Sequence, residues 1–291
     1  MRNTIWPNDI IRAATQKSLV LFVGAGVSAS TRNDLGDTPP NWSTLLQLLA
    51  QAIKLSDTER ETFDSLEKSG RLLDAAELLR FKASETGHTA DLTKALRDAV
   101  QGPQRHPFSA SDWHTTIGNI NPSVIVTTNY DKILENADGL DYMVATHTSE
   151  DVDSLIRSNE PTIIKLHGTV DEPSKTILTR SDYARLHKEG SLALNVVRAL
   201  MWTRTFLFVG YSLSDPDLQV LLQDVFAARS NHNVNPHYIL TSDMSPAYDR
   251  AALQYCYGIS SITYKSDLGD FGLSALQELG QHVSETPPPE Y

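Results

Sequence analysis

The sequence predicts an α/β fold in which helices flank a parallel β-sheet. Short apolar runs, which are typical of strands buried on both faces, recur along the chain. Helical patterns fill the intervals between these runs, and this alternation indicates parallel strand order. The composition agrees, because 40% hydrophobic and 21% charged residues in a chain of 291 are typical of a globular protein.

The first predicted elements are a short amphipathic helix over 7–16 and a strand over 19–23. This strand ends at Gly24-Ala25-Gly26, where the backbone can turn tightly and approach a ligand closely. We expect a helix to start near Val27 and to offer its unpaired N–H groups to a phosphate. Ala29 takes the place of the third glycine in the G-x-G-x-x-G pattern. The same turn is also a common packing solution, so both interpretations stay open at this point.

A block of helices is predicted next, because residues 42–101 carry no strand pattern. Its first helix has one apolar face, and Ser56-Asp57-Thr58-Glu59 forms a capping box that starts the second. Gly102-Pro103 ends the last helix of the block. We interpret residues 35–118 as a helical insertion between the first and second strands. Residues 31–41, before the block, are rich in turn residues and predict a mobile loop.

Strand patterns then return five times, with helical patterns between them. The predicted strands cover residues 123–127, 162–166, 205–209, 237–241 and 261–264. The predicted helices cover residues 130–136, 180–188, 191–203, 216–229, 246–255 and 268–283. We therefore expect one domain over residues 1–285. Residues 286–291 include three consecutive prolines and predict a disordered tail or linker.

Charge and cysteine content exclude several classes of function. The net charge of −11 repels nucleic-acid backbones, so direct binding to DNA or RNA is not expected. The single cysteine excludes an intramolecular disulfide and a zinc site with several cysteines, and it suits a reducing cytoplasm. The first 20 residues contain charged side chains, unlike a signal peptide. Since no apolar run approaches the roughly 20 residues that span a bilayer, we expect a cytoplasmic protein without a membrane segment.

Polar side chains follow four of the predicted strands at the edge where open α/β sheets bind ligands. These strand ends are Gly24-Ala25-Gly26-Val27-Ser28, Thr127-Thr128-Asn129-Tyr130-Asp131, Lys165-Leu166-His167-Gly168 and the segment Gly210 to Asp217. Each also has a purely structural explanation. Asn129 or Asp131 could cap a helix, His167 could be a turn histidine, and Asp215 before Pro216 is a favourable N-cap. The convergence of a phosphate turn, an amide, an imidazole and a hydroxyl-rich turn on one edge favours a shared site.

Taken together, these four stretches resemble the sirtuin superfamily. The first is similar to the family's Gly-Ala-Gly-x-Ser turn over the NAD phosphates, and the second to its Thr-Gln-Asn-Ile-Asp motif. The third resembles the strand that carries the family's catalytic histidine, and Gly210-Tyr211-Ser212-Leu213 resembles its Gly-Thr-Ser-Leu turn. The order and spacing agree over nearly the whole chain. The resemblance implies a Rossmann-like sheet that binds NAD.

The chain departs from the protein-deacylating sirtuins in two respects. It lacks their four zinc-binding cysteines, and Asp37 to Trp42 replaces their Gly-Ile-Pro-Asp-Phe-Arg segment. The helical block and the strand-end motifs look instead like the bacterial sirtuin-like domains of anti-phage defence. That resemblance implies hydrolysis of NAD to nicotinamide and ADP-ribose, without zinc, and depletion of the host's NAD. Such domains often work with a HerA-type ATPase, an Argonaute or a nucleotide-sensing domain.

The resemblance also implies roles for individual residues. The expected catalytic residues are Asn129 and His167. The expected NAD-binding residues are Gly24, Ala25, Gly26, Ser28, Thr128, Asp131, Gly210 and Ser212. Two other functions stay open: a deacylase or ADP-ribosyltransferase, and a non-catalytic module that senses NAD or ADP-ribose. We further expect a homo-oligomer whose assembly or partner gates the activity, because an unregulated NAD hydrolase would kill its own cell.

Overall fold

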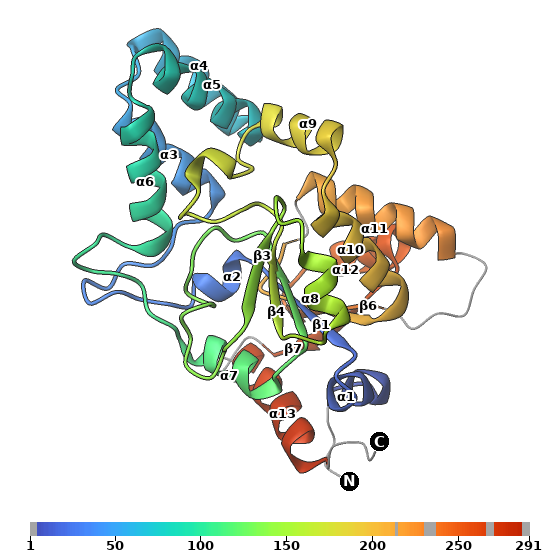
Figure 1. Cartoon of the computed structure of the whole chain (residues 1–291). Coiled ribbons are helices and arrows are strands. Elements are labelled where there is room, and N and C mark those ends of the chain that lie inside the picture. Colours follow the sequence, from blue (N-terminus) through green and yellow to red (C-terminus); the bar gives the residue numbers. More distant parts are fainter. Residues whose placement is uncertain (1–4, 213–214, 230–236, 266–270, 287–291) are drawn as a thin grey trace.

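A seven-stranded parallel sheet forms the centre of the molecule and lies between two layers of helices (Figure 1). The structure is a computed structural model that describes residues 5–212, 215–229, 237–265 and 271–286. The strand order is β3-β4-β2-β1-β5-β6-β7, and every neighbouring pair is parallel. The predicted α/β class with a Rossmann-like parallel sheet is therefore confirmed.

Six of the seven strands occupy the predicted positions. They are β1 (Leu19–Val23), β2 (Val124–Thr127), β4 (Thr162–Lys165), β5 (Thr205–Val209), β6 (His237–Ser242) and β7 (Ile259–Tyr264). Every residue of β1, β2, β4 and β5 is buried, which explains their uninterrupted apolar runs. The strand β3 (Met143–Thr146), at the edge of the sheet, was not predicted from the sequence. Only Ala145 of this strand is buried, while Met143 and Val144 are exposed.

Helices cover both faces of the sheet. Helices α1 (Asn8–Thr15), α7 (Asp112–Ile120) and α13 (Phe271–Glu285) pack on the face that carries Leu19, Leu21 and Val23. Helices α8 (Val152–Arg157), α10 (Leu192–Thr203), α11 (Pro216–Arg229) and α12 (Ala247–Tyr257) cover the face with Val20 and Phe22. Residues 268–270 of the last predicted helix lie outside the described residues. No helix in the described ranges has both the length and the apolar character needed to cross a bilayer.

The predicted block of helices has its own hydrophobic core beside the sheet (Figure 1). It consists of α3 (Trp42–Ala52), α4 (Asp57–Lys68), α5 (Leu72–Glu85) and α6 (Thr89–Gln101). The capping box of α4 is present, with the backbone N–H of Ser56 donating to Glu59 at 2.8 Å. Helix α7, which falls within the predicted insertion, packs on the sheet through Ile117 and Ile120. The division into one domain, an insertion over 35–118 and a tail over 286–291 remains a prediction.

The helix predicted over residues 130–136 is wrong, because this segment forms turns. The ammonium group of the fully buried Lys165 donates to the carbonyl of Asp131, and it pairs with Glu135. The carbonyl of Tyr130 accepts instead from the backbone N–H of Val170 at 3.0 Å. These carbonyls are therefore directed away from the partners that a helix would give them. The spacing of apolar residues within 130–136 could not predict this contact, because Lys165 comes from another strand.

Candidate functional site

The glycine-rich turns after β1 and β5 pack directly against each other. The N–H of Gly24 donates to Val209 at 2.9 Å, and the N–H of Gly26 donates to the carbonyl of Gly210 at 2.8 Å. A Cβ on Gly26 would lie 2.8 Å from that carbonyl oxygen, and Gly210 has a φ of +62°. This contact requires glycine at both turns whether or not a ligand is bound. The helix expected near Val27 starts earlier, as the four-residue α2 (Ala25–Ser28).

The packed turns lie at the topological switch point of the sheet. The chain passes from β1 to β2 on one side of this point, and from β5 to β6 on the other. In open α/β sheets the crevice beyond such a switch point is where ligands bind. The location of the turns therefore supports a binding site that their glycine content alone would not establish.

Three polar side chains join the ends of β1 and β2. The hydroxyl of Ser28 donates to Asp131 Oδ2 at 2.8 Å and accepts from Asn129 Nδ2 at 3.0 Å. Asp131 Oδ1 accepts from the N–H of Ile133 at 3.1 Å, so Asp131 also stabilises its own turn. Neither Asn129 nor Asp131 caps a regular helix, because no helix follows them. Within the described ranges, no donor bonds to Asn129 Oδ1, which leaves this oxygen for a ligand or water.

Thr127 fixes the backbone beneath this cluster. Its hydroxyl donates to the carbonyl of Val23 at 2.7 Å and accepts from the N–H of Asn129 at 3.0 Å. Thr128, the predicted binding residue between them, is half-buried. The two strand ends are thus locked together by backbone and side-chain hydrogen bonds, which preorganises Asn129.

His114 of α7 is a buried ionisable group near Asp131 that the sequence analysis missed. Its Nδ1 accepts from the backbone N–H of Ser111 at 3.1 Å, so the proton of the neutral ring lies on Nε2. Burial lowers the pKa of His114, and the charge of Asp131 opposes this by a smaller amount. Near neutral pH the ring is therefore uncharged. The only sequence signal was a histidine three residues after the N-cap serine of a helix.

His167 lies at the end of β4, next to the end of β2. Thr127 pairs with Lys165, so Asn129 and His167 each follow a paired position by two residues on neighbouring strands. The His167 side chain is 4% exposed, and its Nε2 lies 3.2 Å from Oδ2 of Asp215. The hydroxyl of Tyr183 donates to the same oxygen at 2.8 Å. In the described part of the chain no direct hydrogen bond joins His167 to Asn129.

Asp215 has the structural role that the sequence predicted, together with an unpredicted one. Its Oδ1 accepts from the N–H of Leu218 at 2.9 Å, which confirms it as the cap of α11. Its other oxygen faces His167 and Tyr183. Gly210 and the exposed Ser212 lie in the same segment after β5, at this edge of the sheet. The structure therefore brings the four predicted strand ends to one edge.

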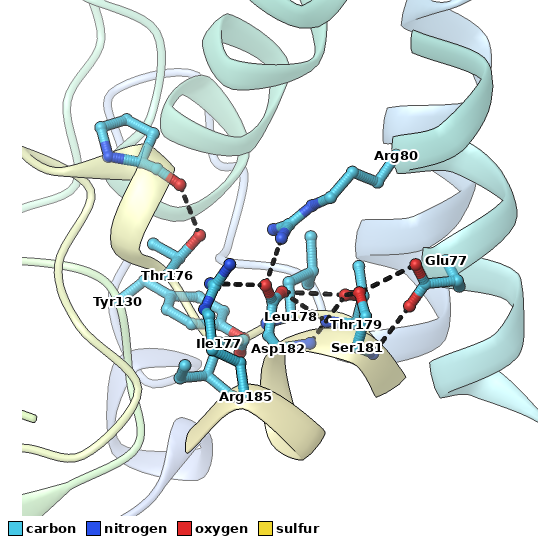
Figure 2. Close-up of polar contacts among 11 residues, drawn as sticks. Glu77, Arg80, Tyr130, Thr176, Ile177, Leu178, Thr179, Ser181, Asp182 and Arg185 are labelled. Carbon is cyan, nitrogen blue, oxygen red and sulfur yellow. Dashed lines mark hydrogen bonds and ion pairs between the residues drawn. The ribbon is translucent and has the colours of Figure 1, made fainter. Parts of the chain in front are cut away.

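A buried carboxylate fixes α9 (Arg180–Glu189), the helix that carries Tyr183 (Figure 2). Asp182 is 1% exposed and accepts from the N–H groups of Leu178 and Thr179 at 3.1 and 2.9 Å. Arg80 of α5 and Arg185 of α9 approach its other oxygen from two sides. A buried charge with so many donors is compensated and orients its surroundings.

Two further contacts extend this seam between α5 and α9. Glu77 accepts from the N–H and the hydroxyl of Ser181 at 2.8 and 2.9 Å, as Figure 2 shows. Asp74 pairs with Arg180. Beneath α9, the hydroxyl of the buried Tyr130 donates to the carbonyl of Ile177 at 2.6 Å, and burial raises the pKa of this phenol. The block of helices is thereby tied to the helix next to His167.

A pocket of about 460 Å³ opens beside the end of β3. Its lining includes His147, Lys175, Arg185, Glu189 and Ser191. Burial lowers the pKa of His147, with the charge of His167 as a smaller cause. Among the described residues no partner bonds to its buried Nδ1. The sequence did not predict this pocket, because β3 itself was missed.

Comparisons with known proteins agree with the motifs. Residues 123–262 match the family model described as SIR2-like domain. The chain is 23% identical over 272 residues to NAD(+) hydrolase ThsA of Bacillus cereus (strain MSX-D12). The alignment covers 92% of this chain and 52% of that protein. It is 26% identical over 240 residues to NAD(+) hydrolase ThsA of Enterococcus faecium, covering 78% of this chain and 44% of that protein.

A third relative is named for defence. Defense-associated sirtuin 2 of Bacillus subtilis is 26% identical over 254 residues, which is 85% of this chain and 23% of that protein. The chain thus spans about half of its ThsA relatives and less of this one. The matches confirm that this chain is similar to the sirtuin-like proteins, as its motifs indicated.

Proposed function

We propose that this chain is an NAD glycohydrolase, which cleaves NAD with water to nicotinamide and ADP-ribose. The observation that carries the proposal is the meeting of two groups at the switch point of the sheet. One is the Ser28–Asn129–Asp131 cluster, and the other is the buried His167 beside Asp215. The relatives named NAD(+) hydrolase ThsA support this choice of reaction.

The reaction needs positioning and one proton acceptor. The bond between the ribose C1′ and the nicotinamide nitrogen breaks, and nicotinamide leaves as a neutral molecule with the bonding electrons. A water oxygen bonds to C1′, and His167 accepts the proton that this water loses, since an imidazole nitrogen without a proton can act as a general base. Asn129 is held by Ser28 through one amide hydrogen, so its oxygen can orient the water or a ribose hydroxyl.

The remaining predicted residues would bind the rest of NAD. We assign the diphosphate to the turn of Gly24, Ala25, Gly26 and Ser28, and the adenosine side to Gly210 and Ser212. We also assign Thr128, which directly precedes Asn129 in the chain, to NAD binding. Asp131 either accepts from the nicotinamide amide or acts only by holding Ser28. These assignments follow the family resemblance and the edge on which the structure places the residues.

The test is NAD consumption by the purified chain, with nicotinamide release and the ribosyl product measured together. We expect ADP-ribose from the wild type, and at least a 100-fold loss in Asn129→Ala and in His167→Ala. Full turnover by either variant would remove that residue from the mechanism. Binding of NAD without release of nicotinamide by the wild type would favour the sensing module.

A deacylase or ADP-ribosyltransferase predicts different products. It would transfer an acyl or ADP-ribosyl group to or from a peptide, and the deacylases carry zinc. We expect neither transfer nor stoichiometric zinc, because the only cysteine is exposed and stands alone. One tightly bound zinc per chain in elemental analysis, or peptide-dependent release of nicotinamide, would reverse this choice.

The proposal extends to a biological role in anti-phage defence. We propose that the chain depletes NAD in the cytoplasm, where its single cysteine suits reducing conditions. The relative named as a defence-associated sirtuin supports this role. We further propose a homo-oligomer whose assembly, or whose partner such as a HerA-type ATPase, gates the activity.

A further inference from the structure

We infer that Asp215 is a positioning residue for His167, and that Tyr183 holds Asp215 in place. This inference rests on the proposed function, in which His167 accepts a proton during cleavage of NAD. The sequence accounts for Asp215 as a helix cap, which needs only one carboxylate oxygen. In the structure that oxygen is Oδ1, while Oδ2 lies 3.2 Å from His167 Nε2.

The contact between Asp215 and His167 joins distant parts of the sheet edge. His167 follows β4 and Asp215 follows β5, and the strand order places β2 and β1 between them. Asp215 and His167 therefore meet although two strands separate the strands that they follow. Capping α11 does not require contact with His167, because the cap bonds to Leu218, three residues along the chain.

Both side chains of the pair between His167 and Asp215 are buried. The side chains of His167 and Asp215 are 4% and 8% exposed. A carboxylate in such a place is costly unless donors surround it. The N–H of Leu218 and the hydroxyl of Tyr183 fill this role, and His167 Nε2 lies within ion-pair distance of the same carboxylate. Cap residues such as serine would satisfy Leu218 but would not supply the charge at His167.

The geometry determines which nitrogen of His167 acts as the base. A carboxylate next to Nε2 favours the tautomer with its proton on Nε2, so Nδ1 is left to accept a proton. The same carboxylate stabilises the imidazolium that forms after the transfer. The Tyr183 ring packs edge-on against the imidazole, with centroids 5.3 Å apart, and restricts its rotation.

Other ionisable groups near this pair are accounted for. His147 lies close enough to interact with the charge of His167, but burial lowers the pKa of His147, so it is neutral near pH 7. Tyr130 interacts with the charge of Asp215, and burial raises the pKa of this phenol. Neither group carries a charge near neutral pH. The charge of Asp182 also acts on both groups, but Asp182 is paired with Arg80 and Arg185. Asp215 is therefore the anion that His167 faces.

The decisive variant is Asp215→Asn. Asparagine caps a helix as well as aspartate does, and its amide oxygen can keep the bond to Leu218. Its uncharged NH2 group then stands where Oδ2 faced Tyr183 and His167. We expect kcat to fall by about 100- to 10,000-fold, with KM for NAD changed by less than about threefold. Tyr183→Phe should show a smaller loss of the same kind.

A second measurement does not require turnover. In nitrogen-15 NMR of the imidazole, wild-type His167 should be the Nε2–H tautomer, and Asp215→Asn should lose the preference for this tautomer. Asp98→Asn is the matched control, since it removes a carboxylate from an exposed pair with Lys94 on α6 and should change neither readout. Should Asp215→Asn fail to fold, Tyr183→Phe answers the same question in both assays.

Unchanged kcat and an unchanged His167 tautomer in Asp215→Asn would overturn the inference. A Nδ1–H tautomer in the wild type would overturn it as well. The two proposals fail separately: a wild type that releases no nicotinamide contradicts the proposed function, whereas the NMR result still decides whether Asp215 positions His167.

Discussion

Ser28 links the turn after β1 to the turn after β2. Its hydroxyl both donates to Asp131 and accepts from Asn129, so it uses a donor and an acceptor at once. Alanine cannot do either. The position of the Asn129 amide therefore depends on a side chain that the motif alone would assign to phosphate binding.

We expect Ser28→Ala to lower kcat/KM for NAD by about 10- to 100-fold, since an oriented hydrogen bond to a charged group contributes about 1.5–3 kcal/mol. Nicotinamide release measures the effect. Ser30→Ala is the control, because Ser30 lies on the next turn and bonds to Val27 and Ser111. Equal activity in wild type and Ser28→Ala would show that Asn129 is positioned without the bridge.

His114 gives a pH dependence of stability whose sign can be worked out. Burial lowers the pKa of His114 in the folded chain, so the unfolded chain binds more protons below its ordinary value of 6.5. Its contribution is present above pH 6.5 and is lost as the pH falls through the folded pKa. We expect the free energy of unfolding to decrease in that window.

The measurement is urea unfolding between pH 7.5 and about pH 5, compared with His114→Gln. The variant should lose part of the pH-dependent slope that the wild type shows. His147→Gln is the companion variant, because burial also lowers the pKa of His147. Identical slopes in wild type and His114→Gln would show that folding does not lower the pKa of His114.

The residue-scale contacts separate what a sequence can predict from what it cannot. The motifs predicted that Asn129 and His167 lie at one edge, because strand ends in a parallel sheet meet there. The cap formed by Asp215 was also predictable, since its partner is three residues away. The pairing of Asp215 with His167 was not predictable, because the two residues follow strands that are separated in the sheet by β2 and β1.

At the scale of elements, α9 connects the block of helices to the catalytic edge. Three residues of α5 bond to the N-terminal turn of α9: Asp74, Glu77 and Arg80. Tyr183 follows directly after this turn, and its hydroxyl donates to Asp215. In Figure 1, α9 lies between the block and α10 and α11. The block therefore supports the site without contributing a residue that the motifs would identify.

We expect Arg80→Ala to lower the free energy of unfolding by about 1.5–3 kcal/mol, because it removes a charged donor from the buried Asp182. Arg71→Ala is the matched control on the same helical block. Arg71 pairs with Asp74 at the surface, and such pairs contribute at most about 1 kcal/mol. Urea unfolding of both variants gives the comparison, and equal losses would show that the seam carries no special stability.

Elements at the edge of the sheet were the hardest to predict. The buried strands carry runs of apolar residues on both faces, whereas β3 needs only Ala145 in the core. The segment 130–136 has a helical pattern, but the carbonyls of Tyr130 and Asp131 accept from the ammonium group of Lys165 in β4. Both errors arise where tertiary contacts, rather than local spacing, determine the backbone.

At the scale of the whole molecule, the proposed activity raises the question of control. The described elements form one sheet with its two helical layers and one block of helices. Every predicted binding motif is already on the same edge of this sheet, and α9 braces that edge. We therefore expect control to act on this arrangement, through a neighbouring molecule or through motion of a loop.

The segment 31–41, after α2, is the loop best placed for such control. In the structure Asn33 accepts from the N–H of Asp37 at 2.8 Å and donates to the carbonyl of His106 at 3.3 Å, while Asp34 pairs with His106. These few contacts tie the loop to the segment before α7. A neighbouring chain that packs on this loop would alter the turn that we assign to the diphosphate, an order–disorder mechanism of a known type.

We therefore expect the specific activity to rise with protein concentration as the chain assembles. The measurement is nicotinamide release over at least a 100-fold range of concentration, beside light-scattering mass, with and without a candidate ATPase partner. His106→Ala should change the concentration dependence, because it removes the side chain that pairs with Asp34 and loosens the loop without touching the catalytic pair. A monomer with full activity at every concentration would exclude gating by assembly, and activity that changes only when the ATPase is added would assign the control to that partner.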